Sequence, residues 1–189
     1  MMYGLPVSVE IGGEVHPIRS DYRAILDIIS AINDEDFSSK EKAVAVMAIF
    51  FEEPSRVQDW EAGIREAFRF ISCGREDEED GKKRPKLIDW EKDFTHIISA
   101  VNKVAGREVR ADEYCHWWTF MGYFDALDGE STFANIVSIR SKKAKGKKLE
   151  KWEQEWYRDN KRMVDIKQHV EYTEQEKELL NALRGKRHG

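Results

Sequence analysis

Cysteine is scarce in this chain, which has only Cys73 and Cys115 among its 189 residues. The two are not arranged as a CxxC pair, and no framework of paired cysteines exists. A secreted protein stabilised by disulfides is therefore not expected. A structural zinc site is not expected either, because it needs a second pair of ligands at suitable spacing.

Long hydrophobic runs are also missing. The longest apolar stretch, residues 43–51, is far shorter than the roughly 20 residues that a membrane-spanning helix needs. The first residues lack a basic region followed by an apolar one, so we expect no signal peptide. These absences predict a protein that does not cross a membrane and that acts in the cytoplasm.

A surplus of positive charge is absent as well, since 36 acidic residues outnumber 31 basic ones and give a net charge of -5. The chain as a whole therefore has no basic field to attract nucleic acid. Charged residues make up 35% of the sequence and hydrophobic residues 41%. This composition is typical of helices with wide charged faces, and the chain is long enough to bury a core without metals.

Motifs for catalysis are missing from the sequence. The carboxylates lie on charged helical faces, with no pair set apart for acid–base work, and no glycine-rich phosphate loop occurs. Cys115 and His116 are adjacent, so on a helix they point about 100° apart and do not easily share a metal ion. We expect no enzymatic activity and no cofactor. A small hydrolase built around Cys115 or His116 stays an alternative, since folding decides whether they pair.

Alternating apolar residues predict an N-terminal β-hairpin. Residues 5–11 follow a period of two, and the glycines Gly12 and Gly13 supply the positive φ angles of a two-residue turn. Residues 15–18 form the return strand, which Pro17 shortens. Because a lone hairpin is only marginally stable in water, it must pack on helices or extend another sheet.

Hydrophobic periodicity predicts helices over most of the remaining chain. The second predicted helix, with Ser38 and Glu41 placed for a capping box, is apolar almost all round and is expected to be buried between neighbours. We therefore predict a mainly α protein, a bundle of about six to eight helices with a small N-terminal β-hairpin. The predicted helices begin at Asp21, at Ser38 or Ser39, at Ser55, at Asp89, at Asp112, at Ser131 or Thr132, near Trp152 and at Thr173.

The charged segment 75–86, with no apolar residue, is the best candidate for a linker. It divides the chain into residues 1–74, with the hairpin and three helices, and residues 87–189, with the remaining helices. The alternative is one continuous domain.

Two groups of residues are candidates for binding a protein partner. The predicted helix from Asp112 to Leu127 is dense in aromatic residues, and tryptophan is frequent among binding hot spots. Core packing explains these aromatic residues at least as well. A lysine cluster follows between Ser141 and Lys151. The candidate partner-binding residues are Trp117, Trp118, Phe120, Lys142, Lys143, Lys145, Lys147 and Lys148.

The lysine cluster also supports an alternative function, that of a nucleic-acid-binding accessory protein using Lys142–Lys151. However, no arginine or aromatic residue is interleaved between Lys142 and Lys148. Proteins that bind single strands combine basic residues with stacking rings. A solvated helix junction, or a contact with an acidic partner, therefore agrees better with the pattern.

A series of short motifs follows a fixed order between residues 87 and 160, with a looser continuation toward the N-terminus through the hairpin and the Asp21-Tyr22-Arg23 helix start. The motifs are Asp89-Trp90-Glu91 with Asp93 and Ile97-Ile98, Ala100-Val101-Asn102 before Gly106, Glu108-Val109-Arg110, His116-Trp117-Trp118-Thr119-Phe120, Phe133, Ile136-Val137-Ser138-Ile139-Arg140 and Lys147-Lys148-Leu149. In order and spacing they resemble the bacteriophage gene-product-fifteen family, encoded in the tail-assembly region of siphophages that infect Gram-positive bacteria.

This resemblance implies a tail assembly chaperone or a related tail-morphogenesis factor. Such a protein coats the long, partly apolar tape-measure helix, keeps it soluble in the host cytoplasm and helps to recruit tail-tube subunits. The tape-measure protein and the tail-tube protein are therefore the expected partners, with self-association left open. The resemblance implies no catalytic residues, and it leaves open whether the protein stays in the mature virion.

Overall fold

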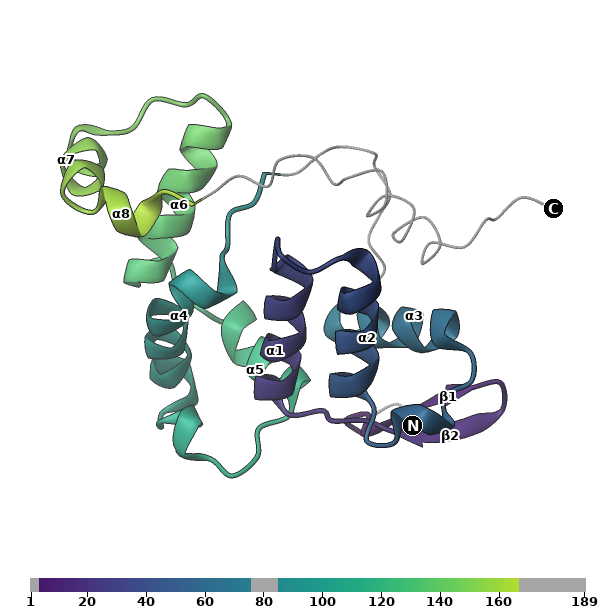
Figure 1. Ribbon diagram of the computed structural model, residues 1–189. Helices are drawn as coiled ribbons and strands as arrows, with labels where there is room; N and C mark the ends of the chain where they lie inside the picture. The colour runs from purple at the N-terminus through teal and green to yellow at the C-terminus, as the bar shows by residue number, and fades with distance from the viewer. Residues whose placement is uncertain (1–3, 76–84, 167–189) are drawn as a thin grey trace. The chain divides into compact units, whose positions relative to one another are not determined.

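The computed structural model describes residues 4–75 and 85–166 (Figure 1). These residues form eight α-helices, two short 3-10 helices and one two-stranded antiparallel sheet, which confirms the predicted mainly α fold with an N-terminal hairpin. In chain order the elements are β1 (Ser8–Ile11), β2 (Glu14–Pro17), α1 (Tyr22–Asn33), α2 (Ser39–Phe50), η1 (Pro54–Arg56), α3 (Trp60–Ile71), α4 (Trp90–Ala105), η2 (Val109–Ala111), α5 (Trp117–Asp125), α6 (Thr132–Ala144), α7 (Lys151–Asp159) and α8 (Lys161–Val164).

The described chain forms two compact units. Residues 4–75 and 114–121 make up the first unit, and residues 85–113 and 122–166 make up the second. The chain therefore passes from one unit to the other within α5. Most of the predicted linker lies outside the described residues, as does the predicted helix at Thr173. The division at residues 75–86 stays a prediction.

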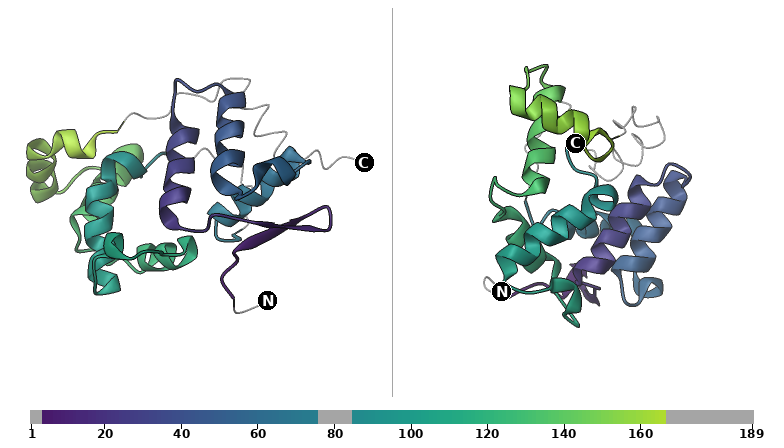
Figure 2. Two further views of the ribbon diagram at one scale, coloured as in Figure 1. Left: turned by 60° about the horizontal axis from the view of Figure 1, so that its bottom comes forward. Right: turned by 90° about the vertical axis from the view of Figure 1, so that its left-hand side faces the viewer.

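The predicted β-hairpin forms, but its first strand begins at Ser8, three residues later than the predicted Leu5. Strands β1 and β2 pair with Ile11 opposite Glu14, so the loop consists of Gly12 and Gly13 alone. Both glycines have positive φ angles, 60° and 86°, as a tight two-residue turn requires. Figure 2 shows the twist of the ribbon. Because side chains alternate along a strand, Val9 and Ile11 point together into the core of the first unit.

Local capping fixes where α1 and α2 begin. The Asp21 side chain accepts a hydrogen bond of 2.9 Å from the Arg23 backbone, and Ser38 forms the predicted capping box with Glu41. The two helices lie side by side (Figure 1). Helix α2 packs between α1 and α3, as expected, but part of its apolar surface stays exposed. Its buried residues face α1 and α3, whereas Val44 is 45% exposed.

Helix α3 begins five residues later than predicted. Pro54 starts the short helix η1 in place of the first helical turn, and Asp59 then caps α3 through a bond of 2.9 Å from the Ala62 backbone. An aspartate at this position satisfies a backbone N–H that the first turn leaves unpaired. As a result, Val57 packs into the core before the helix starts, while Trp60 is largely exposed.

Helix α5 also begins five residues later than predicted, at Trp117 instead of Asp112. The preceding residues run extended beside the start of α1, forming an isolated antiparallel bridge between Asp21 and His116. The Tyr22 backbone donates to the Cys115 carbonyl at 2.9 Å, and the Trp117 backbone donates to the Ser20 carbonyl at 2.7 Å. These bonds use backbone groups that a helix would need within itself.

The second unit is built on α4, α6 and α8. Asp89 caps the start of α4, and Gly106, with a φ angle of 69°, ends it as predicted. Ile136 and Ile139 of α6 pack with Val164 of α8 in a fully buried cluster. Partly buried side chains from α7 and the preceding turn cover this cluster. No helix in the described ranges is long and apolar enough to span a membrane.

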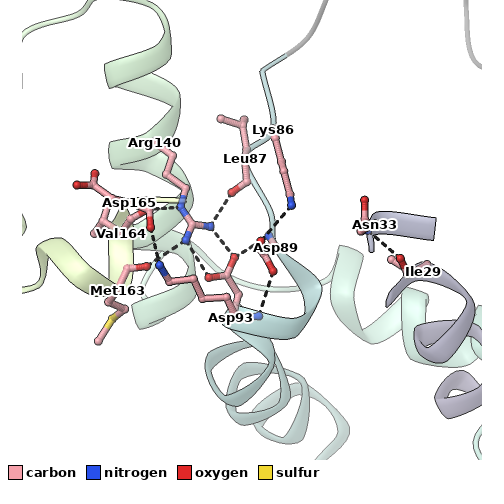
Figure 3. Close-up of polar contacts among 11 residues, drawn as sticks. Ile29, Asn33, Lys86, Leu87, Asp89, Asp93, Arg140, Met163, Val164 and Asp165 are labelled. Carbon is pink, nitrogen blue, oxygen red and sulfur yellow. Dashed lines mark hydrogen bonds and ion pairs between the residues drawn. The ribbon is translucent and has the colours of Figure 1, made fainter. Parts of the chain in front are cut away.

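A buried ion pair joins these elements. Arg140 of α6 lies against Asp93 of α4, and both side chains are at most 3% exposed (Figure 3). Two parallel hydrogen bonds, of 2.5 and 2.9 Å, link the guanidinium to the carboxylate. The other N–H groups donate to the backbone carbonyls of Leu87, Met163 and Val164. All five N–H groups of the guanidinium are therefore paired, as a buried arginine requires.

Candidate partner-binding surfaces

Two of the three aromatic candidates are core residues. Trp117 is 1% exposed, and its indole N–H donates to the Ile71 carbonyl at 2.9 Å. Phe120 is completely buried and stacks on Tyr22 with a centroid distance of 4.6 Å. Neither side chain offers a partner any surface in this structure. Their assignment to partner binding stays a prediction, whereas their contribution to the core is evident.

Trp118 lies at the edge of the same aromatic cluster. It is half-buried, its ring lies 5.8 Å from that of Phe70, and its indole N–H donates to the Phe70 carbonyl at 2.9 Å. One face of Trp118 therefore packs inside the first unit. Its partial exposure keeps it a candidate for partner contact.

The neighbouring Cys115 and His116 are both buried, and the histidine has structural contacts on both ring nitrogens. Its Nε2–H donates to the Pro6 carbonyl at 2.9 Å, while Nδ1 accepts from the Trp118 backbone at 3.0 Å. Neither nitrogen of His116 is therefore directed at the Cys115 thiol in this structure. Within the described residues, no group of three or more potential ligands is placed to hold a metal ion.

Two of the candidate lysines form ion pairs within the second unit. Lys142 lies 2.6 Å from the buried carboxylate of Glu153, and its hydrogen bond is the main cause of the lowered pKa of Glu153. Lys143 lies 2.6 Å from Asp165 and above the ring of Tyr157. Burial opposes its charge, but hydrogen bonds to Asp165 and Tyr157 outweigh this and raise the pKa of Lys143. Both lysines therefore help to hold α6 against α7 and the end of α8.

The other lysines of the cluster are exposed between the end of α6 and the first residue of α7, Lys151. We call residues 145–152 the basic turn. Lys145, Lys147, Lys148 and Lys151 are exposed and have no ion pair within the part of the chain that the structure describes. The next residue, Trp152, is 56% exposed. Four positive charges and one indole ring are therefore exposed on this turn, and Glu150 reduces its net charge to +3.

The sequence did not predict the apolar groove that the structure shows on the first unit. A solvent-open cavity of about 330 Å³ lies between the outer face of α2 and the segment that leads through η1 to α3. Val44 and Trp60, 45% and 44% exposed, border it. We call this cavity the α2–α3 groove. It is lined by the apolar residues Val44, Met47, Ala48, Pro54, Val57 and Trp60 and by the polar residues Ser55 and Gln58.

Gly63 of α3 lies directly beneath two of the side chains that line this groove. A Cβ atom added at Gly63 of α3 would lie 3.0 Å from the Met47 side chain and 3.1 Å from the Val57 side chain. Both side chains line the groove, so the absence of a side chain at Gly63 lets them settle toward α3.

Comparison with protein families gives a match: the family described as bacteriophage Gp15 protein matches residues 1–166. The chain belongs to this family. It is therefore a bacteriophage protein, of the structural or morphogenesis class. A search of curated proteins and a search of solved structures gave no significant match.

Both surfaces of this Gp15-family protein lie inside the matched residues. The α2–α3 groove spans residues 44–60 and the basic turn spans residues 145–152. The sequence does contain a signal for the groove. Residues 43–51 are all apolar, and two neighbouring helices cannot cover apolar side chains on every side of α2. Val44 is an apolar residue of α2 that no neighbouring element covers fully, and it is 45% exposed.

Proposed function

We propose that this Gp15-family protein is a tail assembly chaperone that binds the tape-measure protein and helps to recruit tail-tube subunits in the host cytoplasm. The observation that carries the proposal is the α2–α3 groove, an open site with a mainly apolar lining on a phage protein of the structural or morphogenesis class. The resemblance to proteins encoded in tail-assembly regions supports the same partner. On this proposal the protein acts through contacts alone and not as an enzyme.

The size of the groove suits side chains of a helix. Its volume of about 330 Å³ is at the lower end of the range for binding pockets, which run from about 300 to 1,000 Å³. Apolar side chains spaced three or four residues apart on an amphipathic helix enter such a groove together. A tape-measure protein is expected to be a long, partly apolar helix, so it offers many such sites.

Binding of several copies along one tape-measure chain also explains how a groove of low affinity is sufficient to keep that chain soluble. Several copies of the chaperone would cover successive apolar stripes of one tape-measure chain, and each covered stripe is removed from aggregation. Contacts between neighbouring copies or with tube subunits would raise the overall affinity above that of a single groove. Release of each copy as the tube grows requires that the individual affinity stays modest.

Co-expression with the tape-measure protein of the same phage tests this proposal. We expect the wild-type protein to keep the tape-measure protein soluble and to elute with it on size-exclusion chromatography. The double variant Val44→Asp, Trp60→Ala should bind at least tenfold more weakly, because it removes an aromatic anchor and places a charge in the groove. Val44 and Trp60 are 45% and 44% exposed and lie outside the buried core, so the fold should tolerate the changes.

A matched control changes the same residue types elsewhere. Val104 and Trp152 are 39% and 56% exposed on the second unit, so Val104→Asp, Trp152→Ala repeats the chemistry away from the groove. This control should keep the tape-measure protein soluble. Equal rescue by the groove variant, or no rescue by the wild-type protein, would contradict the proposal.

A further inference from the structure

The basic turn has a charge that differs from that of the whole protein. Residues 142–165 contain nine basic and five acidic residues, a surplus of four positive charges, whereas the chain has a net charge of -5. Lys142 and Lys143 are engaged in ion pairs with Glu153 and Asp165. Six basic residues of this region have no ion pair within the described residues; four of them lie on the basic turn, and Lys161 and Arg162 lie on α8.

The local fold explains why these lysines are displayed. Helix α6 ends at Ala144, and Gly146, with a φ angle of 63°, reverses the chain before α7 begins at Lys151. Within α7, Glu153 is 2% exposed and anchors the helix through Lys142. The adjacent Trp152 therefore points away from the buried side, and it lies in solvent next to the lysines.

We propose that the basic turn binds single-stranded nucleic acid. Lys145, Lys147, Lys148 and Lys151 would contact successive phosphates, and Trp152 would stack on a base. Ammonium groups beside an exposed aromatic ring are the combination with which proteins bind single strands without sequence preference. The sequence alone shows no ring between Lys142 and Lys148, but the structure leaves the indole of Trp152 uncovered beside the turn.

An acidic protein segment fits the same surface less well. Carboxylates would pair with the four ammonium groups, but they would leave the exposed ring of Trp152 without a matching planar group. Duplex DNA also fits less well, because the turn contains no arginine for bidentate contacts to bases. The ring is therefore the feature that selects a single strand.

Fluorescence anisotropy with a labelled oligothymidine of about 20 nucleotides tests the proposal. Four phosphate contacts predict that log K falls with log salt with a slope of about −3. Trp152→Ala should weaken binding by roughly tenfold and leave the slope unchanged, because it removes stacking and no charge. Lys147→Glu, Lys148→Glu should weaken binding by at least tenfold at low salt and reduce the slope by about half.

Matched controls distinguish an effect of the basic turn from an effect of net charge and from the loss of an exposed indole elsewhere. Lys40→Glu, Lys103→Glu makes the same change in net charge on α2 and α4, and Trp60→Ala removes an exposed indole from the first unit. Both should bind the oligonucleotide as the wild type does, apart from a small uniform loss from net charge. Circular dichroism checks that each variant is folded.

Three results would overturn the proposal. The first is no binding of oligothymidine at about 50 mM salt. The second is equal loss of affinity in the turn variants and in their controls. The third is binding of polyglutamate or duplex DNA as tightly as oligothymidine with no effect of Trp152→Ala, which would assign the turn to another partner. Because these measurements use no tape-measure protein, failure here leaves the chaperone proposal intact.

Discussion

Replacing Arg140 with methionine is expected to destabilise the second unit by about 3–5 kcal/mol. The substitution keeps much of the side-chain volume but removes all five N–H donors. Asp93 is 1% exposed and would keep only the bond from the Asp89 backbone. The carbonyls of Leu87, Met163 and Val164 would lose their donor as well (Figure 3).

Hydrogen exchange followed by mass spectrometry measures the loss of stability separately for each helix. We expect peptides from α4, α6 and α8 to exchange faster in Arg140→Met, while peptides from α1 and α2 keep their protection. Arg140→Lys should also lose stability, since an ammonium has three donors and no planar fork. Unchanged protection of α6 and α8 in Arg140→Met would show that the pair does not hold the unit together.

A double-variant cycle distinguishes the loss of the ion-pair interaction from the cost of leaving the buried Asp93 carboxylate unpaired. Adding Asp93→Leu to Arg140→Met removes the carboxylate that the single variant leaves unpaired, so part of the lost stability should return. The surface pair of Lys103 and Asp128, 2.7 Å apart and largely exposed, provides the comparison. Lys103→Ala should cost no more than about 1 kcal/mol, because exposed ion pairs contribute little.

Trp117→Ala is expected to destabilise the first unit by about 3–5 kcal/mol. Trp117 has a large, fully buried side chain that stacks on Phe120 and donates to the Ile71 carbonyl. Alanine leaves a cavity and removes the indole donor from the Ile71 carbonyl, which keeps only the weak contact of the Cys73 thiol. Chemical denaturation monitored by near-ultraviolet circular dichroism should show an earlier transition.

Two exposed tryptophans provide the controls for this substitution. Trp60→Ala and Trp152→Ala remove the same side chain from surfaces, so each should change stability by no more than about 0.5 kcal/mol. A small effect of Trp117→Ala, comparable with these two, would mean that the aromatic helix does not build the core. It would also reopen Trp117 as a residue that contacts a partner.

The elements that sequence predicts well are those whose causes are local. The glycine pair of the hairpin and the caps Asp21, Ser38 and Asp89 act on backbone groups within a few residues. Side-chain oxygens at these positions accept from the next turn whatever the rest of the fold does. The hairpin turn, the return strand and the starts of these helices were therefore predictable within a residue, whereas β1 begins at Ser8, three residues after the predicted Leu5.

Distant contacts decided the boundaries that sequence missed. The start of α5 depends on Ser20 and Tyr22, whose backbone groups hold Cys115 and Trp117 from more than ninety residues away along the chain. Hydrophobic periodicity continues through residues 112–116 and contains no sign of this pairing. The Arg140–Asp93 pair was missed for the same reason, since charged residues on helices are usually solvated.

The candidate surfaces show a similar division. Lysine content correctly marks the region around Lys145 as basic, but only the fold separates the exposed lysines from Lys142 and Lys143, which it places beside acids. Conversely, aromatic density indicated Trp117 and Phe120, which the core buries. Whether an apolar side chain is core or surface depends on how many neighbours the fold supplies, as Val44 and Trp60 show.

Site-specific photo-crosslinking tests the central claim most directly. A benzophenone amino acid placed at Val44 would report on what occupies the α2–α3 groove during co-expression with the tape-measure protein of the same phage. The chaperone proposal predicts a crosslink to the tape-measure protein from Val44 and none from Val104 on α4. No crosslink from Val44, or equal crosslinks from both positions, would contradict the claim that the groove holds the tape-measure helix.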